Sequence, residues 1–177
     1  MSLKDLMETC GGRPVIPLLG SPGARLTDTS LKQNAFNPVL HAGSIQAIAD
    51  RFEPDAVFLM MDLSLEAGAL GLSVQYPLYR PPTVQDHPVR KLQDLEGIRK
   101  ADILDDVRIQ GHIKVLELLG KTLGIPKGVY VSGPFTLAGL LMGTSEVAIA
   151  TIAEPDFLHC LVEFCKDICL RYAKALE

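Results

Sequence analysis

The segment from Asp55 to Gly71 constrains the fold of this chain more than any other stretch. An apolar run, Ala56–Met61, stops abruptly at Asp62, and a short helical pattern that carries Glu66 follows it. Such a run predicts a fully buried strand that delivers a carboxylate at its C-terminal end. In parallel α/β folds this end of the strands holds the chemistry. The segment therefore predicts both the fold class and the face on which an active site lies.

Two further apolar runs predict short strands, at Val15–Leu19 and at Val129–Val131. Pro17 lies inside the first run, which indicates an edge strand or a bulge. Helical patterns separate and follow the strands, and the clearest of them cover residues 37–53, 105–123, 135–141 and 154–176. Right-handed crossovers between successive strands make the predicted sheet parallel.

This order of elements fits either a TIM (β/α)8 barrel or a doubly wound sheet. Three strands cannot close a barrel, and an eight-stranded barrel needs about 250 residues, whereas this chain has 177. We therefore expect one helix-rich α/β domain over residues 1–177, a partial TIM barrel of about three β/α units, truncated before the later strands. An open sheet leaves an apolar edge uncovered, so we also expect the chain to self-associate.

Charge and composition exclude several classes of partner. The net charge is −4 and no basic stripe is present, so we expect no nucleic-acid partner. No apolar run approaches the roughly 18 residues of a membrane span, so we expect no membrane partner. Of the four cysteines, three lie in one predicted helix without the spacing of a metal site, which favours buried structural thiols in a reducing compartment, the cytoplasm. The four are Cys10, Cys160, Cys165 and Cys169.

Asp62 and Glu66 are the first candidates for chemistry. A carboxylate at a strand end acts as a general base, binds a cationic ligand or takes a metal ion. If the chain turns helical directly after Asp62, Glu66 lies one turn further on the same side, and two such close carboxylates raise the pKa of one of them. The competing interpretation makes Asp62 only the N-cap of the following helix and leaves Glu66 in solvent.

Two further segments have the features of ligand-binding loops. The long loop at residues 20–30 carries Arg25, and its glycines allow backbone to approach a ligand; the alternative is a surface Ω-loop. Gly133, Pro134, Phe135 and Thr136 join the third strand directly to a helix. The N–H groups at that helix N-terminus suit an anion, and simple helix capping is the alternative.

The histidines favour structural roles. His112 lies on the apolar stripe of the helix at 105–123, which indicates a hydrogen-bonded core histidine. His41 and His159 fall in helices and are interpreted as packing or surface residues, and His87, before a proline, as a turn residue. No two histidines have the spacing of a metal site.

Four segments together resemble the uroporphyrinogen decarboxylase superfamily in their order and spacing. They are Pro14-Val-Ile-Pro-Leu18, Asp55 to Gly71 with its central Asp62, Pro81-Pro82 to Val89, and Gly133-Pro-Phe-Thr-Leu137. The resemblance runs through nearly the whole chain. It implies a TIM barrel with its ligand at the C-terminal mouth, of which this chain supplies the N-terminal part.

The superfamily has two main branches. One decarboxylates the acetate side chains of uroporphyrinogen in porphyrin (tetrapyrrole) biosynthesis without a cofactor. The other comprises methylcobamide:coenzyme M methyltransferases, which move a methyl group from a corrinoid protein to a thiol activated by zinc. The decarboxylases carry two arginines in an Arg-Gln-Ala-Gly-Arg motif, and at this place the present chain has one displaced arginine, Arg25. The decarboxylases also have a tyrosine at the position that Leu140 occupies in this chain. Without two bidentate clamps, a site binds a polycarboxylate poorly.

The resemblance also implies roles for individual residues. Asp62 matches the catalytic aspartate of the decarboxylases, which steadies pyrrole N–H groups. Glu66 matches a glutamate common in the methyltransferase branch, and both are therefore expected to be catalytic. Arg25 and the turn at residues 133–136 are expected to bind substrate. In the methyltransferases a His-x-Cys pair and a distant cysteine hold zinc, and this chain has no match to them, so zinc is expected only in a full-length parent.

We therefore expect part of an enzyme that transfers a methyl group from a methylcobamide, a corrinoid, to a thiol acceptor. Its partners would be a tetrapyrrole or corrinoid ligand and a corrinoid protein, and the fragment alone is expected to be inactive. Two alternatives remain open: a uroporphyrinogen decarboxylase, which is a lyase, and a non-catalytic tetrapyrrole-binding module.

Overall fold

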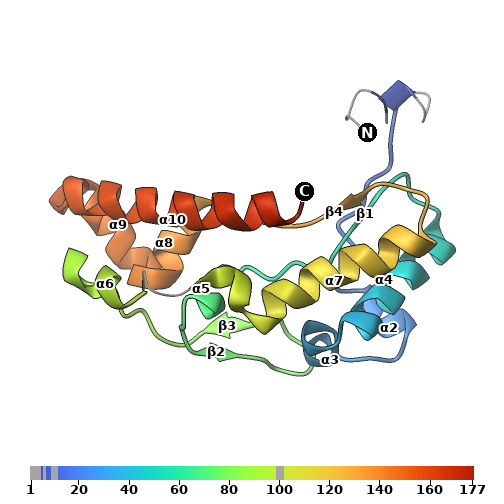
Figure 1. Cartoon of the computed structure of the whole chain (residues 1–177), viewed down its shortest axis with the longest axis horizontal. Coiled ribbons are helices and arrows are strands. Elements are labelled where there is room, and N and C mark those ends of the chain that lie inside the picture. Colours follow the sequence, from blue (N-terminus) through green and yellow to red (C-terminus); the bar gives the residue numbers. More distant parts are fainter. Residues whose placement is uncertain (1–4, 6, 9–11, 99–101) are drawn as a thin grey trace. The chain divides into compact units, whose positions relative to one another are not determined.

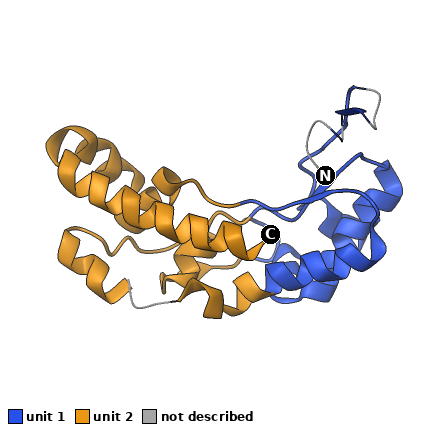
Figure 2. Cartoon of the chain, turned by 45° about the horizontal axis from the view of Figure 1, so that its top comes forward, with its two compact units in different colours: residues 1–61, 77–80, 111–130 blue, residues 62–76, 81–110, 131–177 orange. Residues whose placement is uncertain are grey.

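The computed structural model describes residues 5, 7–8, 12–98 and 102–177 of the chain. Cys10 lies outside the described residues. The chain divides into two compact units, shown in different colours in Figure 2. Unit 1 comprises residues 1–61, 77–80 and 111–130, and unit 2 comprises residues 62–76, 81–110 and 131–177. The single domain expected over residues 1–177 stays a prediction.

Helices dominate the described residues, as the sequence predicts (Figure 1). In chain order the elements are α2 Gly23–Leu26, α3 Leu31–Phe36, α4 Pro38–Phe52, β1 Val57–Phe58, α5 Leu65–Ala69, β2 Val74–Gln75, β3 Thr83–Val84, the 3-10 turn η1 Leu92–Asp94, α6 Leu95–Ile98, the 3-10 turn η2 Ile103–Asp105, α7 Val107–Thr122, β4 Lys127–Gly128, α8 Pro134–Met142, α9 Thr144–Ala153 and α10 Pro155–Ala175.

A parallel pair of strands, β1 and β4, lies at the core of unit 1, with Val57 opposite Lys127. The backbone N–H of Leu59 extends the pair by donating to the Gly128 carbonyl at 3.0 Å. Apolar side chains from α4, α7 and the β1 region pack around the pair. The parallel direction and the strand within residues 56–61 are therefore confirmed. The third strand lies at Lys127–Gly128, directly before the predicted Val129–Val131, so its predicted bounds were wrong.

The strand expected at Val15–Leu19 does not form, and this prediction was wrong. Among the described residues Val15 is bonded to Asp55: its N–H donates to the Asp55 carboxylate at 2.6 Å, and its carbonyl accepts from the Asp55 N–H at 3.0 Å. Pro14 and Pro17 have no N–H to donate, so a ladder cannot propagate along this apolar run.

Residues 20–30 are not one open loop. They contain α2, and Ser30 begins α3 with a capping box: its hydroxyl accepts from the Gln33 N–H at 3.1 Å, and the Gln33 side chain accepts from the Ser30 N–H at 2.8 Å. Helix α3 was not predicted, although a serine three residues before a glutamine is the sequence pattern of such a box. Asn37 and Pro38 begin α4 as predicted.

The glycines of this region serve close packing of the chain on itself. A Cβ atom added at Gly20 would lie 2.7 Å from the Leu59 carbonyl oxygen, and one at Gly23 would lie 2.5 Å from the Ser44 carbonyl oxygen. Both distances are shorter than van der Waals contact. These glycines therefore let α2 approach α4 and the end of β1, rather than a ligand, which was the role expected from the sequence.

Replacing Gly23 with alanine is expected to lower the free energy of unfolding by roughly 1–3 kcal/mol, because backbone must move to admit the new methyl group. Gly43 is the matched control: it lies in α4 with nothing within 4 Å of an added Cβ atom. There alanine is expected to stabilise by up to about 1 kcal/mol through helix propensity. Urea unfolding of both variants measures the difference, and equal effects at the two sites would contradict this account.

Unit 2 is built on α8, α9 and α10, with the short antiparallel pair β2–β3 in the segment between α5 and α6. The apolar face of α10 recurs every three or four residues and supplies much of the core. Its buried residues are Phe157, Leu158, Leu161, Cys165, Ile168, Cys169 and Tyr172.

The chain after β3 caps the C-terminal end of α8. Donors from residues 87–90 bond the carbonyl groups of three consecutive residues, which a helix end leaves without intrahelical partners. The bonds run from His87 Nδ1 to Leu140 O (2.8 Å), from Val89 N to Leu141 O (3.1 Å) and from Arg90 Nη1 to Met142 O (3.0 Å). His87 is thus a capping residue of α8, and its interpretation as a turn residue was wrong.

The fold class expected from the sequence is confirmed at the coarse level: the chain is a helix-rich α/β structure with few strands. Within the described residues the strands form two pairs, and the eight-stranded barrel stays a prediction. In that same part of the chain no single helix is long and apolar enough to cross a membrane. Only α8 and α9 taken together reach that length and composition, and they are bent by 105°.

Candidate functional site

Glu66 is a buried carboxyl group held by one residue of a distant segment. It lies in the first turn of α5 with 1% of its surface exposed. Its Oε1 accepts from the Ser132 N–H at 2.7 Å, and its Oε2 lies 2.9 Å from the Ser132 hydroxyl. The expectation that Glu66 lies in solvent was therefore wrong.

Burial is the main reason why the pKa of Glu66 is raised above its ordinary value. The hydrogen bonds from Ser132 lower the pKa, and the nearby charge of Asp62 raises it. The upward shift expected for one of two close carboxylates is thus confirmed, although desolvation contributes more than repulsion. A raised pKa is the property that a proton carrier needs near neutral pH.

Asp62 is held by contacts on both carboxylate oxygens. Its Oδ1 accepts from the Ser64 N–H at 2.9 Å and from the Ser64 hydroxyl at 2.6 Å, which shapes the turn that leads into α5. Its Oδ2 forms an ion pair with the guanidinium of Arg108, and both side chains are 7% exposed. Asp62 therefore holds the turn before α5 and also belongs to a buried charge pair, whereas the N-cap of α5 is Ser64, so the interpretation of Asp62 as that N-cap was wrong.

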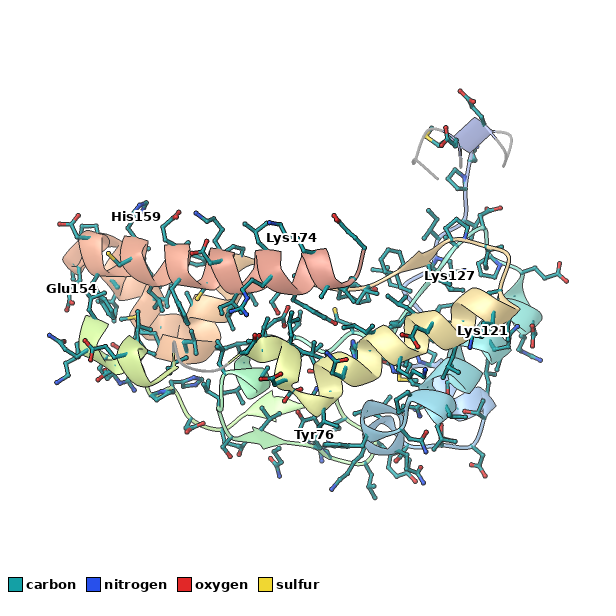
Figure 3. All side chains as sticks on the ribbon, viewed as in Figure 1. Tyr76, Lys121, Lys127, Glu154, His159 and Lys174 are labelled. Atoms are coloured by element: carbon teal, nitrogen blue, oxygen red, sulfur yellow. The ribbon has the colours of Figure 1, made fainter. Side chains whose placement is uncertain are left out.

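Arg108 and Tyr76 complete this cluster, and the sequence analysis missed both. Arg108, in the first turn of α7, donates to the Tyr76 hydroxyl, and its guanidinium carbon lies 4.5 Å from the centre of the Tyr76 ring. Tyr76, labelled in Figure 3, directly follows β2. The signal was available: Arg108 stands four residues before His112 and therefore on the same buried face of α7.

The turn that leads into α8 lies beside these carboxyl groups in unit 2. Gly133 is the N-cap of α8 and Pro134 its first residue, so the helix begins one residue before the predicted start at residue 135. The Ser132 hydroxyl lies 3.3 Å from the Leu63 carbonyl oxygen. Phe135 is 55% exposed and Thr136 is also exposed. Their accessibility is what a ligand-binding turn requires, and their role in binding stays a prediction.

Arg25 belongs to unit 1, whereas the carboxyl groups belong to unit 2. Its side chain is exposed at the end of α2 and lines a cavity of about 330 Å³. The other lining residues are Ser21, Pro22, Ala24, Thr29, Leu31 and Tyr79. A cationic head with hydroxyl groups around a partly apolar cavity suits an anionic ligand. The assignment of Arg25 to substrate binding stays a prediction.

His41 and His112 form a buried pair in unit 1, 2% and 6% exposed, with ring centres 5.5 Å apart. His41 Nε2 accepts from the Met60 N–H at 3.0 Å, so the ring is neutral with its proton on Nδ1. Burial first, and the charge of His112 second, lower the pKa of His41 to about 3. Packing roles for both residues are thus confirmed, and they are structural groups of the core.

The cysteines of α10 divide between core and surface. Cys165 and Cys169 are buried, and burial raises their thiol pKa values to about 12 and about 11. Cys160 is exposed, so its interpretation as a buried thiol was wrong. Within the described ranges no three histidine, cysteine or acidic side chains are grouped so as to hold a metal ion. These residues therefore do not fit the zinc that the resemblance implies, and no chemical step is assigned to it.

Comparison with known proteins agrees with the family resemblance. The sequence model of the family Uroporphyrinogen decarboxylase (URO-D) matches residues 8–176. Methylcobamide:CoM methyltransferase MtbA of Methanosarcina mazei is 31% identical over 125 residues, which are 69% of this chain and 36% of that protein. Uroporphyrinogen decarboxylase of Bacillus anthracis is 30% identical over 153 residues, which are 82% of this chain and 43% of that protein.

A solved structure shares the fold. A methyltransferase from Methanosarcina mazei superimposes with a TM-score of 0.82 over 98% of this chain and 54% of its own chain, at 22% sequence identity. The chain thus spans about half that structure's length and less than half of the two relatives. Since the family model covers nearly every residue, the chain belongs to the uroporphyrinogen decarboxylase (URO-D) family.

Proposed function

We propose that this chain is part of a methyltransferase that moves a methyl group from a methylcobamide to a thiol acceptor. The observation that carries the proposal is that the Asp62 carboxylate is already occupied by hydrogen bonds within the protein. Three of the roughly four acceptor positions of its carboxylate are used by Ser64 and Arg108. An aspartate that steadies pyrrole N–H groups, as in the decarboxylases that it resembles, needs those positions for its ligand.

Charge supports the same choice. Asp62 is paired with Arg108, so one carboxylate already offsets the guanidinium charge, and Glu66 adds a second acidic group beside the pair. The cluster therefore offers no excess positive charge to a polycarboxylate. In addition, the stretch from Leu19 to Arg25 contains one arginine, Arg25, where the decarboxylases have two.

Within this proposal Asp62 and Glu66 supply the acidic groups of the site at the mouth of a TIM barrel. Arg25 and the turn of Gly133, Pro134, Phe135 and Thr136 bind the ligand. Transfer breaks the cobalt–carbon bond, whose electron pair stays on cobalt, forms a sulfur–carbon bond and releases the thiol proton. The raised pKa of Glu66 makes this carboxyl group the best candidate to hold that proton.

The test is a methyl-transfer assay with the purified complete protein that contains this chain. Methylcobalamin and coenzyme M are supplied in a buffer that contains zinc, and the methylated thiol is measured by mass spectrometry. We expect one methylated thiol for each methylcobalamin consumed. Absence of this product from folded protein would count against the proposal.

A second candidate, uroporphyrinogen decarboxylation, is favoured by one observation: the decarboxylase of Bacillus anthracis aligns with a larger share of the chain than the methyltransferase does. Release of CO2 from uroporphyrinogen by the same preparation would support it. Binding of a corrinoid or porphyrin, seen as a spectral shift without turnover of either substrate, would instead indicate a non-catalytic module.

A further inference from the structure

We propose that Arg108 is a positioning residue that fixes the orientation of the Asp62 carboxylate for the ligand site. Its catalytic consequence rests on the proposed function, whereas the pairing itself is testable without any substrate.

The contacts of Arg108 join three separate elements of unit 2. Its guanidinium reaches from the first turn of α7 to Asp62, which precedes α5, and to Tyr76, which follows β2. The ring of Tyr76 stacks against the guanidinium at 4.5 Å, and only 6% of Arg108 is exposed. With the second oxygen of Asp62 held by Ser64, the carboxylate has one fixed orientation.

Gly68 of α5 leaves the space that the guanidinium occupies. A Cβ atom added there would lie 3.3 Å from Arg108 Nη1, 3.4 Å from Val74 Cγ2 and 3.8 Å from the Tyr76 hydroxyl. The first of these distances is tighter than ordinary contact. Helix α5 therefore carries glycine at the position that faces the arginine, although glycine disfavours a helix interior.

Charge explains why an arginine is needed. A guanidinium stays protonated in proteins, and its planar fork holds a carboxylate more rigidly than an ammonium group does. Burial lowers the pKa of Arg108, and the negative charge of Asp62 is the largest influence that opposes it. Arg108 thus supplies the positive charge that keeps two neighbouring acids compatible in a buried site.

A double-mutant cycle tests the pairing. Arg108→Met, Asp62→Asn and the double variant are compared by denaturant unfolding of this chain. Each single change is expected to lower the unfolding midpoint, because it leaves the other charge buried without its partner, and the double variant is expected to lose less than the sum. Lys114→Met is the matched control, since Lys114 pairs on the same helix with Glu117 while both side chains are exposed. Additive losses would overturn the pairing.

Chemical rescue tests positioning in the methyl-transfer assay. Arg108→Ala is expected to lower kcat on the order of tenfold to a hundredfold with a smaller change in KM. Guanidinium at millimolar concentration, which fills the vacated space, is expected to restore part of the loss, and neutral urea is not. Loss of kcat that guanidinium cannot restore in a folded variant would overturn the positioning role. An inactive wild type would refute the proposed function and leave the double-mutant cycle as the test of the pair.

Discussion

Lowering the pH from 7 toward 4 is expected to destabilise the protein through His41 by about 3 kcal/mol, in addition to the effect of its carboxylates. The folded state holds this ring neutral, with a pKa of about 3, against the ordinary value of 6.5. Between pH 6.5 and pH 3, His41 therefore binds a proton in the unfolded state but stays neutral in the folded state. Stability is fully present above pH 6.5 and falls as the pH drops toward 3.

The physical causes are burial first and the charge of His112 second, and one hydrogen bond shows why the protonated ring does not fit. A protonated His41 has no lone pair left to accept the Met60 N–H, and its charge would face His112 in a buried site. His41→Gln is the control, because its amide oxygen can replace Nε2 as the acceptor without titrating. Urea unfolding at pH 7, 5 and 4 should show that the stability gap between the two proteins narrows or reverses as the pH falls. A gap that does not change with pH would contradict the neutral state of His41.

Replacing Glu66 with glutamine is expected to keep the fold and to lower methyl transfer by about 10²–10⁴-fold. The glutamine oxygen can accept from the Ser132 N–H, and its amide can donate to the Ser132 hydroxyl, which is then free to donate to the Leu63 carbonyl. The free energy of unfolding should therefore stay within about 1 kcal/mol of the wild type at pH 5. What the change removes is the exchangeable proton.

The pH dependence gives this prediction a second measurement. Since the pKa of Glu66 is raised in the folded state, its contribution to stability is present below its ordinary value of 4.5 and is lost as the pH rises through the folded pKa. The glutamine variant lacks this loss and should gain on the wild type between pH 5 and 8. Glu66→Leu is the contrasting variant, because it leaves the Ser132 N–H unsatisfied and should cost about 1–3 kcal/mol. Full activity in the glutamine variant would make Glu66 a purely structural group.

Local signals predicted the helices that carry them. Asn37 followed by Pro38 indicates where α4 begins, because a side-chain acceptor and a fixed φ angle suit the first turn of any helix. The spacing of apolar residues predicted α10, because residues three or four apart lie on the same face of a helix. The predicted strand at Val15–Leu19 failed although its residues are apolar, because strand formation depends on N–H donors that Pro14 and Pro17 lack.

The candidate site was only half predictable. Asp62 and Glu66 follow an apolar strand pattern, so their place in the sequence marked them as a pair. Their partners lie far along the chain: Arg108 is 46 residues from Asp62, and Ser132 is 66 residues from Glu66. No periodicity relates residues at such separations. The sequence therefore predicted the two acidic residues but not their partners, Arg108 and Ser132.

The sequence by itself determined the helices with clear capping or periodicity signals, such as α4, α7, α8 and α10, a parallel strand within residues 56–61, the two acidic residues after it and the family to which the chain belongs. These follow from short-range patterns and from motifs in a fixed order. Only the tertiary structure decided that Glu66 is buried, that Asp62 is paired with Arg108 and that the glycines at 20 and 23 serve packing. Burial and charge pairing depend on which distant segments meet, and burial of this kind is what raises the pKa of Glu66.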